Sequence, residues 1–271
     1  MLQFSLRKRL YFFIYWLQDL GEKMFRILEN TGGTFILFTD TVKTFFTTPL
    51  RWKETLNQMQ KVGVKSFPLV FLTAIFTGMV LALQSAYQLK KFSALQFTAD
   101  LVSLSITREL GPVLTAMVVA GRVGAGMTAE LGTMKVTEQI DALKSLATDP
   151  IRYLVVPRVV ACFFMLFVLT IYADFIGIAG GYIVSIFKLG IASEQYINRL
   201  FIALFPKDVF TGLIKAFAFG LVISTVGCYY GFRARGGAEG VGLATTMSVV
   251  VSLITIIAFD CFFTAIFYFI G

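Results

Sequence analysis

The sequence contains no histidine, which removes the side chain that most often shuttles protons or binds transition metals. Its three cysteines, Cys162, Cys228 and Cys261, lie in apolar runs without paired spacing, and this favours buried free thiols over a disulfide or a zinc site. No G-x-x-x-x-G-K-[ST] phosphate loop is present, and without histidine there is no Ser/His or Cys/His pair for nucleophilic catalysis. We therefore expect a chain that is not an enzyme and that holds no metal or cofactor of its own.

Charged residues are also scarce. They make up 15% of the 271 residues, whereas a soluble domain of this size carries about 25%. Hydrophobic residues make up 57%, and a membrane-spanning helix needs about 20 mainly apolar residues in a row. We therefore predict an all-α membrane protein, and we read its net charge of +8 as a topology signal and not as a nucleic-acid site. The five predicted spans lie at about residues 66–89, 98–129, 153–187, 208–232 and 240–270.

Residues 1–65 form a region of different character, with ten Lys/Arg interleaved among Phe, Leu, Tyr and Trp. This pattern suits amphipathic helices that lie in the membrane interface, and a soluble helical cap is the alternative. The apolar stretch 10–17 is not followed by a small-residue cleavage site, so it does not resemble a cleaved signal. We divide the chain into this N-terminal interfacial region and a membrane domain at 66–271.

The distribution of basic residues predicts the orientation. If the N-terminus lies in the cytoplasm, sixteen Lys/Arg fall on that side, five fall on the other side and three lie within spans. Basic residues concentrate in cytoplasmic loops of membrane proteins. Five spans then place the C-terminus on the outer side.

The second span contains the adjacent charges Arg108 and Glu109. Ionisable side chains at bilayer depth are costly and usually face a partner or a water-filled cavity. Both residues lie about 15 Å below the outer face, at the rise of an α-helix. Lys215, Asp260 and Asp174 fall at a similar depth on other spans. We predict that these side chains meet in the outer half of the membrane.

This cluster has two interpretations: an ion-pair network that joins the spans, or a polar site beside an outer-facing cavity. Intramembrane charges usually mark pathways, which favours the second, and both can hold together. Adjacent helical residues point about 100° apart, so Arg108 and Glu109 cannot face one partner. We expect one of them to hold a neighbouring span and the other to face the cavity.

Two further features mark the second span. Gly111–Pro112 predicts a bend, since proline lacks a backbone donor and clashes with the preceding turn. The bend either makes room for a ligand or serves packing alone. Ala116, Ala120 and Gly124 recur at intervals of four, which is typical of closely packed membrane helices.

Residues 133–147 predict a short amphipathic helix on the cytoplasmic side, ended by Asp149–Pro150. It is too short and too polar to span a membrane. The helix either rests on its own bundle or inserts into a groove of a soluble partner. Its apolar face comprises Val136, Ile140, Leu143 and Ala147.

Four ordered motifs, TRELGPV at 107–113, AGRVGA at 120–125, AELG at 129–132 and TEQIDAL at 137–143, resemble the MlaE family of permeases. These are the membrane subunits of lipid-transporting ABC systems. Lys215 and Asp260 also fit, and the resemblance covers about residues 60–271. Residues 1–60 are similar only in their amphipathic character.

The resemblance implies a homodimeric permease in the inner membrane of a double-membrane bacterium, moving phospholipids between the inner and outer membranes. A cytoplasmic ABC ATPase would bind ATP and Mg²⁺ and contact the 133–147 helix, and it often carries a small STAS-domain protein. An MCE-domain protein would lie on the periplasmic side. The implied substrate cavity and gate comprise Gln84, Arg108, Glu109, Lys215 and Asp260. The implied ATPase-coupling residues are Glu130, Lys135, Thr137, Glu138, Ile140, Asp141 and Leu143.

Three other functions were weighed. The same type of transporter could carry a sterol or another hydrophobic compound. An intramembrane aspartyl protease would need Asp174 and Asp260 to share a site. A passive channel would conduct without an ATPase. A transport subunit without enzymatic activity remains our expectation.

Overall fold

The computed structural model describes the backbone of residues 2–270 and the side chains of residues 21–22, 24–25 and 28–269. Within this part every regular element is a helix and no strand occurs, so the all-α prediction is confirmed. Five helical segments are long and apolar enough to cross a membrane, as predicted. These segments are Trp52–Lys90, Leu95–Val136, Ile151–Phe187, Pro206–Arg233 and Gly237–Phe269.

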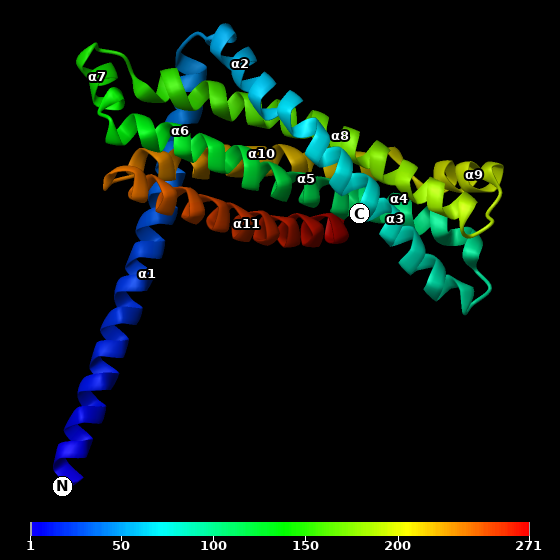
Figure 1. Ribbon diagram of the computed structural model, residues 1–271, viewed down its shortest axis with the longest axis horizontal. Coiled ribbons are helices and arrows are strands. Elements are labelled where there is room, and N and C mark those ends of the chain that lie inside the picture. Colours follow the sequence, from blue (N-terminus) through cyan, green and yellow to red (C-terminus); the bar gives the residue numbers. More distant parts are fainter. Residues whose placement is uncertain (1, 271) are drawn as a thin grey trace.

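The five segments run side by side along the long axis of the molecule (Figure 1). The short helix α7 (Gln139–Ser145) marks one end of this bundle and α9 (Ser193–Ala203) marks the other, and we call these the α7 end and the α9 end. The remaining helices of the bundle are α2 (Trp52–Val62), α3 (Phe67–Lys90), α4 (Thr98–Ser105), α5 (Gly111–Val119), α6 (Ala125–Val136), α8 (Val156–Phe187), α10 (Pro206–Arg233) and α11 (Gly237–Ile270).

Helix α1 (Leu2–Thr47) crosses the bundle direction near the α7 end and does not run along it (Figure 1). Arg233, the last residue of α10, donates hydrogen bonds to the Glu29 carboxylate at 2.6 Å and to the Asn30 side chain at 3.2 Å. Leu37 and Thr41 are buried against the bundle. This course suits a helix that lies in the membrane interface.

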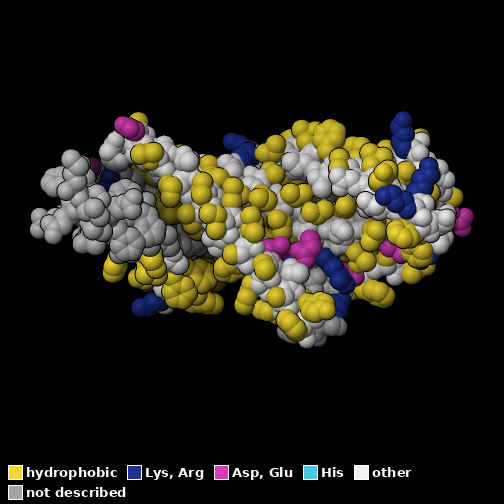
Figure 2. Space-filling view, turned by 90° about the horizontal axis from the view of Figure 1, so that it is seen from below, with side chains coloured by type: hydrophobic (Ala, Val, Ile, Leu, Met, Phe, Trp, Pro, Cys, Tyr) yellow, Lys and Arg dark blue, Asp and Glu magenta, His cyan; other side chains and the backbone are white. Residues whose placement is uncertain are grey.

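The surface of the bundle is rich in large apolar side chains. Leu166, Phe219 and Ile223 are among the fully buried core residues, while Phe175 and Phe262 are exposed. Figure 2 shows hydrophobic side chains over most of one face, with acidic and basic side chains together partway along it. Soluble proteins rarely expose apolar surface of this extent, and a surrounding bilayer accounts for it.

Glycines allow close contact between the backbones of α3 and α8. A Cβ atom on Gly78 would collide with the Gly177 carbonyl, and one on Gly180 would collide with the Ile75 carbonyl. Membrane helices gain van der Waals contact when small residues let their backbones approach. Larger side chains at these two glycines would push the two spans apart.

The second span holds two π-helical turns, η3 (Ile106–Leu110) and η4 (Ala120–Gly124), on either side of α5. The Gly111 N–H donates to the Ile106 carbonyl, five residues earlier, and Pro112 has no N–H to donate. The predicted break at Gly111–Pro112 therefore takes the form of a π turn within a continuous helical segment. Such turns are frequent at functional sites.

The prediction of one continuous helix over residues 133–147 is wrong. Helix α6 continues to Val136, and α7 starts only at Gln139. Between them Glu138 adopts a left-handed conformation with φ of 61°. After this turn Ile140 packs against the bundle. Periodicity did not reveal it because the left-handed residue is neither glycine nor asparagine.

Candidate functional site

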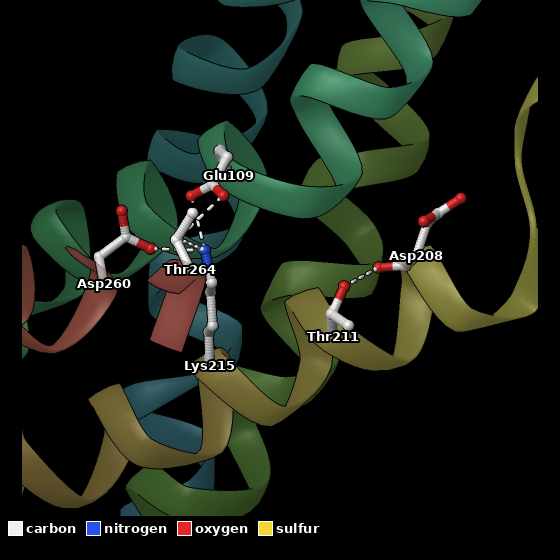
Figure 3. Close-up of polar contacts among 6 residues, drawn as sticks. All are labelled: Glu109, Asp208, Thr211, Lys215, Asp260 and Thr264. Atoms are coloured by element: carbon white, nitrogen blue, oxygen red, sulfur yellow. Dashed lines mark hydrogen bonds and ion pairs between the residues drawn. The ribbon is translucent and has the colours of Figure 1, made fainter. Parts of the chain in front are cut away.

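A lysine buried between three spans forms the centre of the site. The Lys215 side chain on α10 is 1% exposed. Its Nζ donates to Glu109 Oε2 at 2.6 Å, to Asp260 Oδ1 at 2.8 Å and to Thr264 Oγ1 at 2.7 Å (Figure 3). These contacts use all three protons of the ammonium group. A charge at this depth is tolerated only when it is paired in this way.

The site joins the second span to α10 and α11. Thr264 Oγ1, on α11, donates in turn to Glu109 Oε1 at 3.0 Å. The depth count had placed Lys215, Glu109 and Asp260 at one level, and the structure brings them into direct contact. Thr264 was not anticipated, since a threonine in an apolar run carries no distinguishing signal. We call these four residues the Lys215 cluster.

Arg108 pairs with Asp208, which was not among the predicted site residues. Its Nε donates to Asp208 Oδ1 at 2.7 Å, and the Asp208 side chain is 3% exposed. Asp208 Oδ2 also accepts from the Phe205 N–H at 3.1 Å, so the carboxylate stabilises the start of α10. The signal for Asp208 was its spacing from Lys215: residues seven apart lie on one face of a helix. Because Asp208 lies at the predicted start of a span, it did not count as a charge within the membrane.

The adjacent charges of the second span therefore both contact α10, two turns apart. Glu109 points to the Lys215 cluster, and Arg108 points to Asp208 nearer the start of the helix. The prediction that only one of them holds a neighbouring span is therefore wrong. In the structure each holds α10 while leaving part of its side chain exposed, 39% for Glu109 and 54% for Arg108.

Asp174 does not join the cluster, contrary to the prediction that it meets the other charges. It lies on α8 against Gly111, where a Cβ atom would collide with its Oδ1. That oxygen is buried without a hydrogen-bond partner. No hydrogen bond or ion pair between described residues joins it to Asp260, so the shared carboxylate site that a protease needs is not seen there. Counting gave its depth but not the rotation of α8.

Gln84 also lies apart from the cluster. It occupies an exposed position on α3, and none of the hydrogen bonds among the described side chains links it to Lys215, Glu109 or Asp260. The polar site therefore lies between the second span, α10 and α11. Its charges are unequal, since one lysine faces two carboxylates. The partly exposed carboxylates and Arg108 can contact a ligand, whereas Lys215 is enclosed.

At the α7 end, a second ionic group ties three helices together. Glu130 on α6 accepts from Lys61 of α2 at 3.1 Å and pairs with the buried Arg158 of α8 at 2.9 Å. These two ion pairs hold α6 against α2 and α8 shortly before the turn into α7. Because both of its partners belong to this chain, Glu130 has a structural role at the turn.

The turn and α7 divide into an inner and an outer side. Ile140 is buried and Leu143 packs partly against the same core, while Thr137, Glu138 and Leu146 are exposed, Leu146 to 75%. Of the predicted apolar face, Ile140 and Leu143 thus rest on the bundle, whereas Ala147 is exposed.

A salt bridge closes the turn into α7. Lys135 Nζ donates to Asp141 Oδ2 at 2.9 Å. The hydrogen bond from Lys135 lowers the pKa of Asp141 below its ordinary value of 3.8. The bridge spans the left-handed Glu138 and holds α6 and α7 in their relative orientation.

The small residues of the second span lie where this span packs against α10. Ala116, Ala120 and Gly124 are buried, and a Cβ atom on Gly124 would come within 3.2 Å of Ile223. One turn further, Thr128 hydrogen-bonds Ser248 of α11 at 2.8 Å. These contacts connect the α7 end to the Lys215 cluster through tightly packed helices.

Comparison with known proteins adds to this geometry. Residues 55–266 match the protein family described as Permease MlaE. The chain is 43% identical over 250 residues to a probable ABC transporter permease protein of Rickettsia bellii, covering 92% of this chain and 96% of the relative. It is 47% identical over 204 residues to a probable ABC transporter permease protein of Synechocystis sp., covering 75% and 78%. It is 38% identical over 219 residues to Protein TRIGALACTOSYLDIACYLGLYCEROL 1, chloroplastic, of Arabidopsis thaliana, covering 81% and 63%.

Proposed function

The chain belongs to the MlaE permease family, and from this premise we propose that it moves phospholipids between the inner and outer membranes of a bacterium. It is a transporter permease subunit. The observation that carries the lipid proposal is the Lys215 cluster: a polar site within the membrane, enclosed by apolar helices and partly open on one side.

A phospholipid combines a charged headgroup with two hydrocarbon chains. Glu109, Asp260 and Arg108 are partly exposed and offer both signs of charge to a headgroup. Phe262 on α11, which is 59% exposed, belongs to the apolar surface beside them that suits hydrocarbon. The Arabidopsis relative is named for a glycolipid, trigalactosyldiacylglycerol, and this name supports a lipid as cargo.

Energy for transport would come from a partner chain. The sequence lacks a phosphate loop, and an ABC transporter permease works with an ATPase. We assign the ATPase contact to the outer side of the turn and of α7, at Thr137, Glu138 and Leu146. Ile140 and Leu143 would pass movement of α7 into the bundle, and the Lys135–Asp141 bridge would keep the turn rigid.

The α7 end would face the cytoplasm. Sixteen basic residues lie on that side in the predicted topology, against five on the other. Helix α1 would then lie among cytoplasmic headgroups, and the C-terminus would lie in the periplasm. An MCE-domain protein would cover the α9 end, and a STAS-domain protein would bind the ATPase. A second copy of the chain would complete the transporter as a homodimer.

Movement would reach the cluster through the second span. ATP binding in the partner would shift α7, and α6 would carry the shift through η4 and η3 to Glu109. A π turn holds one extra residue, so a change in its register rotates the residues beyond it. Glu109 would then alternate between its bond to Lys215 and a lipid headgroup as the outer-facing cavity opens and closes.

Purification of the native complex tests this proposal. The tagged chain, expressed at its natural level, is extracted in mild detergent, and the bound proteins and lipids are identified by mass spectrometry. We expect an ABC ATPase, an MCE-domain protein and phospholipid. A bound sterol without phospholipid would favour the alternative cargo. Recovery of the chain with neither an ATPase nor a lipid would contradict the proposal, and ion conductance without an ATPase would favour a channel.

A further inference from the structure

An apolar groove lies between the last turns of α1 and the first turns of α8, and Leu221 of α10 also lines it. Its volume is about 200 Å³. A dry apolar cavity of about 150 Å³ can take up benzene, so this groove has room for a length of hydrocarbon. The residues that matter for its occupant are Phe38, Phe45, Phe46, Val156, Val160 and Phe164.

The walls of the groove offer no free hydrogen-bonding side chain. The one polar lining residue, Thr41, donates its hydroxyl to the Leu37 carbonyl at 2.6 Å. At its edges Phe46 is 79% exposed and Phe164 is 47% exposed. Such a surface is occupied by hydrocarbon and not by water or a polar peptide.

A cation that has no ion-pair partner among the described residues lies four residues before Val156, which lines the groove. This cation, Arg152, belongs to the π turn η5 (Ile151–Val155), and its spacing of about one turn from Val156 directs it toward the same side of the helix. Its Nε is buried and lacks a hydrogen-bond partner, and no ion pair with a described residue neutralises it. The neighbouring Tyr153 carries Arg51 over its ring at 4.2 Å, and Arg51 pairs with Glu54 at 3.2 Å. A guanidinium in this position suits a phosphate group.

From these observations we propose that the groove binds an anionic phospholipid, with one acyl chain between α1 and α8 and its phosphate on Arg152. The lipid fastens the end of α1 to the bundle. This site is separate from the Lys215 cluster: Leu221 lies six residues further along α10, about 9 Å away, on a different face of the helix. The proposal therefore does not require phospholipid to be the transported cargo.

Quenching of tryptophan fluorescence by brominated lipids tests the site. Trp16 and Trp52 are replaced by phenylalanine, and Phe164→Trp is introduced in the full chain, purified with its partner subunits. The complex is reconstituted in vesicles that contain dibrominated phosphatidylglycerol or dibrominated phosphatidylcholine. Phe175→Trp serves as the matched control, since Phe175 lies on the same helix and is 72% exposed, away from the groove.

We expect the tryptophan of Phe164→Trp to be quenched with about fivefold preference by the brominated phosphatidylglycerol over the brominated phosphatidylcholine. This is the effect of one basic residue near an anionic headgroup. Adding Arg152→Gln to Phe164→Trp should bring the ratio of quenching by the two lipids to about one. The tryptophan of Phe175→Trp should show no preference, whether residue 152 is arginine or glutamine. Phe46→Trp, on the opposite wall, repeats the test if Phe164→Trp fails to fold.

Two results would overturn the proposal. Equal quenching by both lipids, unchanged by Arg152→Gln, would mean that ordinary bilayer lipid fills the groove without headgroup recognition. Absence of quenching by either lipid would mean that protein covers the groove, such as a second copy of the chain.

Discussion

Replacement of Lys215 by methionine tests whether the cluster is held together by its buried charge. Methionine keeps the length of the side chain and removes the ammonium group. The three hydrogen bonds to Glu109, Asp260 and Thr264 are lost, and two carboxylates remain side by side. Breaking a buried ion pair by removing one partner destabilises a protein by about 3–5 kcal/mol.

The lower end of this range applies here. Glu109 is 39% exposed and Asp260 is 23% exposed, so water can reach both carboxylates after the lysine is lost. We expect a loss of about 3 kcal/mol for Lys215→Met. Glu109→Gln should cost only about 1 kcal/mol, because the amide oxygen still accepts from Lys215 and the remaining pair is electrically balanced.

Thermal unfolding of the purified chain in detergent measures the difference. At about 2 °C per kcal/mol for a chain of this size, Lys215→Met should lower the melting temperature by about 6 °C and Glu109→Gln by about 2 °C. The triple replacement Lys215→Met, Glu109→Gln and Asp260→Asn should recover part of the loss, since no unpaired charge remains. If Lys215→Met melts at or above the temperature of Glu109→Gln, the buried charge of Lys215 does not hold the cluster together.

Three further predictions concern other parts of the chain. Gly78→Val should lower stability in the same unfolding assay by about 1–3 kcal/mol through overpacking against α8, whereas Gly126→Ala, with open space around it, should change it little; equal effects would contradict this packing. Leu146→Ala should weaken ATPase co-purification without lowering the melting temperature, and unchanged co-purification would remove this side chain from the contact. The folded-state pKa of Asp141 is lowered, so its bridge to Lys135 contributes above the ordinary pKa of 3.8 and is lost as the pH falls through the lowered value. Carboxyl titration by NMR of isotope-labelled protein checks the sign, and an upward shift would contradict the bridge.

Depth was the part of the site that the sequence could predict. Because an α-helix rises by a fixed amount per residue, counting along three spans placed Glu109, Lys215 and Asp260 at one level. Helix rotation was not predictable from one chain. Asp174 therefore fell at a similar level but faces Gly111, and the pairing of Asp208 with Arg108 was not predicted.

The membrane spans could be read from composition because a bilayer imposes a length and an apolar character on each of them. The third, predicted at 153–187, is found at Ile151–Phe187. Local departures from regular α-helix could not be predicted in this way. The left-handed Glu138 depends on where Ile140 finds a buried place, and the π turn before Gly111 depends on how Pro112 is accommodated. Tertiary packing decides both.

If the Lys215 cluster takes part in lipid transport, changing it must alter ATP-driven phospholipid transfer by the reconstituted complex. Glu109→Gln is the informative variant, since it leaves the fold nearly as stable as that of the natural chain. We expect the ATPase to assemble and hydrolyse ATP, while transfer falls about tenfold, the effect of about 1.4 kcal/mol at the rate-limiting step. Transfer at the natural rate by both Glu109→Gln and Lys215→Met would show that the Lys215 cluster has no part in transport.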